Sequence, residues 1–371
     1  MILLRKVVLA FAFLFTLQQT SVFAATLVDL ESGGNPGFTA NSVSGATFNG
    51  KAYAFYQKTQ TFKGFNYVTL RMAYQCTAGQ WGPGAWCFQT VDGLGGGYNK
   101  IFGNVGYGIS TAVFQNKLHV FYHKADMTSL RHATLDSSGV WTFEIVAQPS
   151  PTPIVGFSPE ASPTAALTYA WDNNLHVAYA GVGSDGRLNL LKHSWMSAGG
   201  VWNHETLDGA GGCCGQLVNT GRVIYSIGAN VLSDNSIHIT YGLGEGTTFH
   251  RDVFYIPGTG WNWYTTQYNN PWGAVYSSTA RGDRLETYYV SSANYTLALA
   301  AYTSGGTWGM NYLYTPNAKG SPWYSIVALT HPNPLTTLDM TTVAYIDSSN
   351  RLMDKWNQGG FVGYTPLLVD A

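Results

Sequence analysis

Apolar and polar residues alternate along most of the chain, in short segments that are separated by glycine-containing turns. One segment, which carries a tyrosine near its end, recurs every 48 to 66 residues. Its six tyrosines are Tyr56, Tyr122, Tyr179, Tyr241, Tyr289 and Tyr345. A run of small residues precedes each copy, and two further alternating segments follow it, the last often opened by tryptophan. Alternation with a period of two predicts β-strands, and no helical period interrupts it.

Each repeat therefore contains four strands. Four strands in a repeat of roughly 40 to 60 residues are typical of a β-propeller blade. We predict an all-β fold, a six-bladed β-propeller with four antiparallel strands per blade. Small residues in the first strands, such as Ser110, Ala112 and Ala166, suit the crowded centre of the ring.

Ring closure has two candidate strands. The segment TLVDL at 26–30 resembles the endings of the fourth strands, which predicts that it pairs beside the last blade. The C-terminal TPLLVD has the same pattern, so the source of the outermost strand stays open.

The first residues predict export. Arg5 and Lys6 precede an apolar run that ends in small residues before Ala25, which is the pattern of a secretory signal peptide. We expect a signal peptide at 1–24, a single domain at 25–371, and a periplasmic or extracellular location. No second apolar run of that length follows, so we expect no transmembrane segment.

Composition narrows the classes of partner. The formal net charge is −1, and removal of the two basic leader residues makes it −3. Only 11% of residues are charged, while 15% are aromatic and 43 are glycine. This composition argues against disorder and disfavours nucleic acid or an anionic membrane as a partner. No spacing of metal ligands and no phosphate-binding loop stands out, so we expect neither a metal nor a cofactor.

Four cysteines remain after export. Cys76 and Cys87 flank a Gly/Pro-rich turn between two strand-like segments, which predicts a disulfide that closes the hairpin. Cys213 and Cys214 are adjacent, and either a vicinal disulfide or two thiols fits them.

One turn carries a resemblance to known families. The stretch LDSSGVWT at 135–142 is similar to a degenerate Asp box, with Gly139 one position later than usual. On this motif and the blade layout, the chain resembles secreted bacterial propellers of the sialidase-like and lectin-like kind. The Asp box implies the fold and not an activity. Sialidases also carry an Arg-Ile-Pro motif, which this chain lacks, so sialidase activity is not expected.

The stretch HVFYHK at 119–124 raises the possibility of catalysis. His119 has His176 and His238 at the same offset in other repeats, which favours a packing role for it. Arg131 matches Arg71, whereas no equivalent of His132 is apparent. A propeller polysaccharide lyase is the alternative function, with Tyr122 or His123 as the base and Arg131 against a uronate carboxylate. Whether the chain is an enzyme stays open, and a non-catalytic protein is favoured.

The loops between blades predict a different site. They are long, and they carry aromatic side chains suited to the apolar faces of sugars. The predicted ligand-binding residues are Tyr98, Phe157, Cys213, Cys214, Trp272 and Trp323. We therefore expect a lectin-like, non-catalytic, carbohydrate-binding propeller whose partner is a glycan or a cell-surface polysaccharide.

Overall fold

The fold comes from a computed structural model of the 371-residue chain. It describes residues 43–76, 86–94, 104–150, 164–169, 172–197, 199–214, 223–244, 248–268, 276–281, 284–291, 296–303, 309–313, 327–332, 339–346, 352–358 and 361–363. The predicted signal peptide and the segment 26–30 lie outside these residues. In the described part of the chain every regular element is a strand, and no helix has the length and hydropathy that a membrane crossing requires.

The described strands form six four-stranded antiparallel sheets, each built from consecutive strands. The first sheet holds β1 (Val43–Phe48), β2 (Lys51–Phe62), β3 (Phe65–Gln75) and β4 (Trp86–Asp92). The second holds β5 (Val105–Phe114), β6 (Lys117–Lys124), β7 (Leu130–Leu135) and β8 (Trp141–Ala147). The third holds β9 (Thr164–Tyr169), β10 (Asn174–Gly181), β11 (Leu190–Met196) and β12 (Trp202–Asp208). The predicted four-strand repeat is confirmed in these sheets.

The remaining sheets repeat the same order. The fourth holds β13 (Val223–Val231), β14 (Ile237–Gly244), β15 (Thr248–Ile256) and β16 (Gly260–Tyr268). The fifth holds β17 (Tyr276–Arg281), β18 (Arg284–Ser291), β19 (Thr296–Thr303) and β20 (Gly309–Leu313). The sixth holds β21 (Val327–Pro332), β22 (Asp339–Ile346), β23 (Leu352–Gln358) and β24 (Phe361–Gly363).

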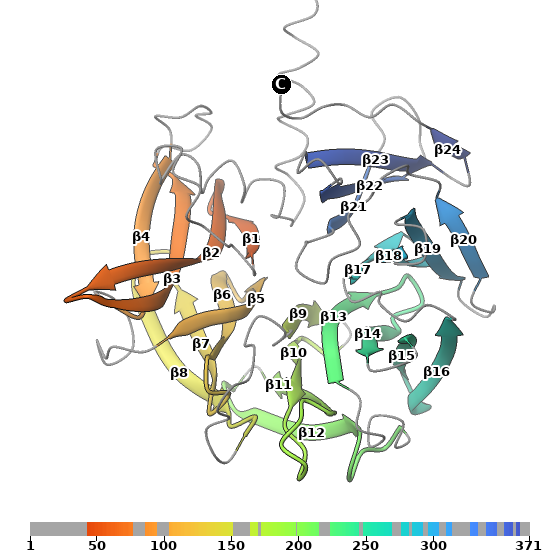
Figure 1. Ribbon diagram of the computed structural model, residues 1–371, viewed down its shortest axis with the longest axis horizontal. Helices are drawn as coiled ribbons and strands as arrows, with labels where there is room; N and C mark the ends of the chain where they lie inside the picture. The colour runs from red at the N-terminus through yellow and green to blue at the C-terminus, as the bar shows by residue number, and fades with distance from the viewer. Residues whose placement is uncertain are drawn as a thin grey trace, which may run out of the picture.

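The sheets are arranged around a common centre (Figure 1). From β1 to β21, the first strand of each sheet contacts the first strand of the next. These strands carry the small residues that the sequence placed at the centre; for example, Ser44 Oγ lies 2.9 Å from Thr111 Oγ1 of the neighbouring sheet. Small side chains let the inner strands approach closely, while the later strands fan outward.

The apolar cores lie between sheets rather than within one. We call the contact between two consecutive sheets a seam and name it by the two sheets. Each of seams 1–2, 2–3 and 3–4 contains a buried cluster that draws residues from both sides. Burying one large apolar side chain contributes about 1.5–3 kcal/mol, so the seams stabilise the arrangement of the sheets. Members from the two sides are Phe55 and Val120 in seam 1–2, Phe121 and Val177 in seam 2–3, and Leu191 and Ile239 in seam 3–4.

A β-bulge recurs near the end of the fourth strand in the first three sheets. The register slips between Leu70 and Arg71 in the first sheet, and again between Leu191 and Lys192 in the third. The extra residue is buried in each case, as Val91 and Leu207 show. A bulge redirects the side chain that follows it, and here it turns that side chain into the next seam.

The turn between β7 and β8 is the predicted Asp-box turn. Asp136 Oδ1 accepts hydrogen bonds from the backbone N–H groups of Ser138 and Val140, each at 2.9 Å. Gly139 has a φ of 85°, a conformation that favours glycine. The motif therefore serves to shape this hairpin.

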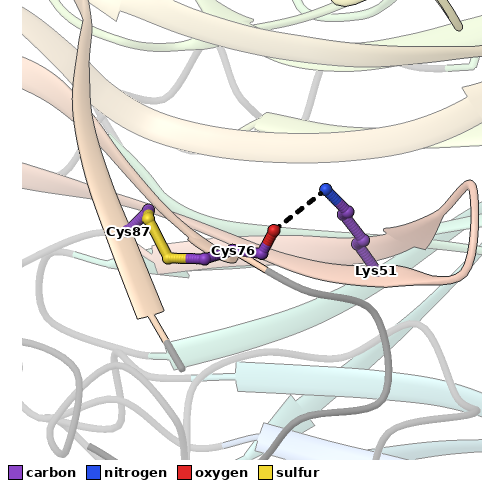
Figure 2. The surroundings of a disulfide bond; sticks show 3 residues. All are labelled: Lys51, Cys76 and Cys87. Carbon is purple, nitrogen blue, oxygen red and sulfur yellow. Dashed lines mark hydrogen bonds between the residues drawn. A yellow bond between two sulfur atoms is a disulfide. The ribbon is translucent and has the colours of Figure 1, made fainter. Parts of the chain in front are cut away.

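The predicted disulfide is present. Cys76 and Cys87 are bonded and join the end of β3 to β4, with 5.3 Å between their Cα atoms. Figure 2 shows Lys51 Nζ donating to the carbonyl of Cys76 over 3.3 Å, which adds a contact from β2.

Candidate functional site

A chain of four polar side chains crosses seam 2–3. His119 Nδ1 on β6 lies 2.8 Å from His132 Nε2 on β7, and His132 Nδ1 lies 2.7 Å from Glu144 Oε1 on β8. The indole Nε1 of Trp202, on β12 of the third sheet, donates to the same Glu144 oxygen over 2.8 Å. His119 is 2% exposed, whereas the Glu144 side chain is 47% exposed. The chain therefore runs from the interior to the surface.

The same chain recurs at seam 3–4. His176 Nδ1 lies 2.9 Å from His193 Nε2, and His193 Nδ1 lies 2.8 Å from Glu205 Oε1. Trp261 Nε1, from β16 of the fourth sheet, donates to Glu205 Oε1 over 3.1 Å. This set has a second carboxylate at its histidine end, because His176 Nε2 lies 3.1 Å from Asp172 Oδ2. We refer to each set as a His–His–Glu–Trp chain.

Strand register explains why the sequence builds these chains. His132 is directly opposite Glu144 across β7 and β8, and His193 is directly opposite Glu205 across β11 and β12. Residues opposite each other in a sheet point to the same face. In both sheets this face meets the next sheet, whose fourth strand supplies the tryptophan.

The His–His–Glu–Trp chain at seam 3–4 borders a pocket of about 310 Å³. Its floor and walls combine apolar aromatic surface with hydrogen-bonding groups. Trp261 meets His193 edge-on with ring centroids 5.4 Å apart, and Trp195 stacks on the same imidazole at 5.3 Å. The lining residues are Asp172, His176, His193, Trp195, Glu205, Ile237, Tyr255 and Trp261.

The number of imidazole N–H groups in each His–His–Glu–Trp chain can be compared with the number of hydrogen bonds that need one. Each histidine pair lies between two groups that only accept: Asp172 and Glu205 in the third sheet, Glu144 and the Phe114 carbonyl in the second. Two neutral imidazoles provide two N–H groups in total. Three hydrogen bonds need an N–H donor: the bond between the two histidines and the bond from each histidine to its acceptor. One acceptor therefore lacks a proton when both histidines are neutral.

Burial keeps the first histidine of each set, His119 or His176, neutral near pH 7. Burial, together with the neighbouring His193, lowers the pKa of His176 to about 4. Burial and the neighbouring His132 likewise lower the pKa of His119 to about 3. The hydrogen bond from His132 lowers the pKa of Glu144, which therefore stays ionised. A hydroxyl that donates to one of the carboxylates would complete the set of bonds.

The other described sheets keep only part of this arrangement. In the fourth sheet, His238 Nδ1 lies 2.8 Å from Asp252 Oδ2, and both side chains are buried. In the first sheet, Tyr53 takes the place of His119 and stacks on Tyr74 with centroids 5.9 Å apart. Among the described side chains, the full His–His–Glu–Trp chain thus forms at seams 2–3 and 3–4.

A second type of cluster lies deeper in the seams. In seam 1–2, Tyr122 donates to Asp92 Oδ2 over 2.6 Å, and Arg131 Nη1 donates to the same oxygen over 2.8 Å. Asp92 follows the bulge of β4, which turns it toward the second sheet. In seam 3–4, Asp208 follows the same bulge, accepts from Tyr241 and pairs with Arg251 Nε at 3.1 Å. These Tyr–Asp–Arg triads fasten neighbouring sheets together.

The residues suggested for a lyase lie inside the seams. Tyr122 and His123 are each 0% exposed. Burial and Asp92 raise the pKa of Tyr122 well above its ordinary value, and burial lowers the pKa of His123 to about 3. Arg131 is engaged with Asp92. The three side chains therefore do not present a base and a cation to a substrate in solvent.

The histidine repeat is more extensive than the sequence pattern indicated. His119 is buried between strands, as expected of a packing residue. The expectation that His132 has no equivalent is wrong, because His193 holds the same register position on β11. The bulges and unequal strand lengths hid this match, although LRHA and LKHS align once Arg131 and Lys192 are paired.

The predicted loop site is only partly described. Tyr98, Phe157, Trp272 and Trp323 lie outside the described residues. Cys213 and Cys214 are free thiols, the first exposed and the second buried, so the vicinal disulfide is not formed. Burial raises the pKa of both thiols, most strongly that of Cys214, which is unsuited to nucleophilic chemistry.

The seam residues Glu144, Glu205, Trp202 and Trp261 were not singled out from the sequence. The fourth-strand motif W–x–x–E, in WTFE and WNHE, was visible as part of the repeat. Its pairing with a histidine and with the tryptophan of the next sheet depends on register and on packing between sheets.

Comparison with known proteins supports the fold. No protein-family model matches the chain, and no curated protein matches it in sequence. Among solved structures, AofleA from Arthrobotrys oligospora is 14% identical, with 90% of this chain and 88% of that chain covered and a TM-score of 0.52. The SapL1 lectin, solved in complex with alpha methyl fucoside, is 16% identical, with 86% and 95% covered and a TM-score of 0.50. A fucose-specific lectin from Aleuria aurantia is 16% identical over 72% of this chain and 79% of that chain, with a TM-score of 0.48. The six sheets around a common centre, together with the two structures whose TM-scores are 0.52 and 0.50, thus show an all-β fold of propeller type with a lectin among its structural neighbours.

Proposed function

We propose that this chain is an exported, six-bladed β-propeller that binds carbohydrate without converting it. The observation that carries the proposal is the pocket at seam 3–4. Its aromatic faces suit the apolar face of a sugar ring, and its carboxylates accept hydrogen bonds from hydroxyl groups.

The geometry of the pocket favours a small neutral sugar unit. Its volume of about 310 Å³ lies at the lower end of the range for ligand pockets, which is roughly 300–1,000 Å³. The Asp172 and Glu205 side chains are 33% and 31% exposed, so a ligand can reach them. Both carboxylates disfavour an acidic sugar here. The related His–His–Glu–Trp set at seam 2–3, whose Glu144 side chain is 47% exposed, is the second candidate.

The fold of the SapL1 lectin makes alpha methyl fucoside a reasonable first ligand to test. A glycan microarray with the purified protein would identify the sugar, and calorimetry would measure its affinity. Trp261→Ala removes the indole from the pocket and should weaken binding at least tenfold. Trp263→Ala is the matched control, because Trp263 is on the same strand, 51% exposed, and outside the pocket lining.

Two outcomes would overturn the proposal. The first is a glycan affinity that both tryptophan variants leave unchanged. The second is turnover of the bound glycan, seen as new reducing ends or as the ultraviolet absorbance of an unsaturated uronate, which would favour the lyase alternative.

A further inference from the structure

Seams 1–2 and 3–4 each bury a carboxylate that has no counterpart among the described residues of seam 2–3. Asp92 and Asp208 are 1% and 0% exposed, and each binds a tyrosine hydroxyl and an arginine. The equivalent position in the second sheet is Ala147. Asp92, Asp208 and Ala147 occupy the same position, because each follows the bulge of its own fourth strand and pairs with a leucine of the third strand. The pairs are Leu70 with Asp92, Leu191 with Asp208, and Leu130 with Ala147.

The groups that would bind the missing carboxylate are still present. Tyr179 pairs in register with Lys192, as Tyr122 pairs with Arg131 and Tyr241 with Arg251. Seam 2–3 therefore has the tyrosine and a cation, but alanine in place of aspartate.

Lys192 lacks a counter-charge in this seam. Its Nζ donates to Thr206 Oγ1 over 2.9 Å, which uses one of its three N–H donors. The residue is half-buried, and burial lowers its pKa. Across the part of the chain that the structure describes, it forms no ion pair. An anion beside it would stabilise the charged ammonium.

Tyr179 has a hydroxyl proton to donate. Its oxygen accepts from Ser194 Oγ over 3.3 Å, and the side chain is 3% exposed. In the neighbouring seams the matching hydroxyl donates to aspartate. No described acceptor takes the Tyr179 proton.

A cleft occupies the space where the carboxylate is missing. Its volume is about 740 Å³, and its lining includes Ala147, Gln148, Tyr179, Lys192, His204 and Thr206. Glu205 also borders it, but its carboxylate is held by His193 and Trp261 of the other seam. The cleft thus combines a cation, a hydroxyl donor and room for a ligand.

His123 adds an independent observation from the opposite side of the seam. Its ring lies 6.3 Å from the Tyr179 ring and is 0% exposed. Neither ring nitrogen has a hydrogen-bond partner among the described residues. A buried imidazole without partners is costly, and it indicates that a polar group belongs in this seam.

From these observations we propose that the cleft of seam 2–3 binds the carboxylate of a ligand in the position that Asp92 and Asp208 hold in the neighbouring seams. Lys192 pairs with the carboxylate and Tyr179 donates a hydrogen bond to it. This site is separate from the neutral-sugar pocket of seam 3–4 and does not depend on it.

Two classes of molecule carry such a group: an acidic sugar, such as a uronate, and the C-terminus of a peptide. Sodium glucuronate and glucose form a matched pair of sugars that differ in the carboxylate. A short peptide with a free C-terminus and its amidated form provide the corresponding peptide pair. The better of the two acidic probes identifies the source.

The test is a titration of the purified protein with these four probes, followed by nuclear magnetic resonance or calorimetry. We expect binding of an acidic probe at least tenfold tighter than of its neutral partner. Ala147→Asp should supply the carboxylate internally and weaken acidic-probe binding at least tenfold. Lys192→Met should do the same, Lys192→Arg should retain binding, and Thr142→Ala, an exposed change on β8, should have no effect.

Two results of this titration would overturn the proposal. If neither acidic probe binds more tightly than its neutral partner, the cleft holds water alone. If Ala147→Asp and Lys192→Met each change the affinity of a bound acid by less than tenfold, the acid binds elsewhere. Neither result bears on glycan binding at seam 3–4, which Trp261→Ala tests separately.

Discussion

Tyr122 donates a 2.6 Å hydrogen bond to Asp92, which lies 30 residues earlier and on the neighbouring sheet. Arg131 binds the same carboxylate oxygen. A single acid thus joins two sheets, and it is placed by a bulge that turns the strand end into the seam.

We expect Asp92→Asn to destabilise the protein. The change leaves the Arg131 guanidinium without its charge partner in a largely buried position, a loss of about 3 kcal/mol in the free energy of unfolding. Urea denaturation at neutral pH measures it. Asp126→Asn is the control, because its partly exposed pair with Lys124 should contribute less than about 1 kcal/mol. Equal effects of the two variants would contradict a structural role for the triad.

Stability should fall as the pH falls below neutrality, in part because of His123. Burial lowers its pKa in the folded protein to about 3, whereas an unfolded histidine titrates near 6.5. Between these values the unfolded chain binds a proton that the folded chain does not. The contribution is a loss of about 2 kcal/mol at pH 5 relative to pH 7.

The variant His123→Phe isolates this contribution. His119 and His176 also titrate with lowered pKa values and act in the same direction, so the wild-type profile alone is not sufficient. The difference in unfolding free energy between wild type and variant should change by about 2 kcal/mol from pH 7 to pH 5. A constant difference would show that His123 takes up its proton over the same pH range in the folded and the unfolded chain.

Removal of the Cys76–Cys87 disulfide should lower stability. The bond closes a short loop, with a sequence separation of 11, and should contribute about 2–3 kcal/mol by restricting the unfolded chain. The double variant Cys76→Ser, Cys87→Ser should therefore melt earlier than wild type. Wild type under reducing conditions should match the variant, and peptide mapping that finds both thiols free in protein purified without reductant would contradict the pairing.

Closure of the ring is testable by truncation at each end. If the segment 26–30 pairs beside the last sheet, deletion of 25–31 exposes a strand edge. We expect a lower melting temperature and aggregation, measured by scanning fluorimetry with light scattering. Deletion of 366–371 should have a smaller effect, and the reverse order would identify the C-terminal segment as the closing strand.

The fold was largely predictable, whereas the site was not. Period-two alternation and a recurring tyrosine are local properties, so the four-strand repeat could be derived from them. The pairing of Glu205 with Trp261, and the exchange of aspartate for Ala147, depend on bulges and on contact between sheets. The residues themselves form visible local patterns, but their contacts do not follow from those patterns, and the match between His132 and His193 was hidden because the repeats differ in length.

The position of the glycan site is the most informative prediction. The sequence placed it on the loops between blades, with Trp272 and Trp323 as anchors, and the geometry of the described residues favours Trp261 at seam 3–4. Loss of a binding anchor costs about 1–3 kcal/mol. We expect Trp261→Ala to cause the largest loss of glycan affinity, because its indole both borders the pocket and holds Glu205 in place. Calorimetry on the three single variants measures this order. A larger loss from Trp272→Ala or Trp323→Ala, with Trp261→Ala near wild type, would move the site to the loops.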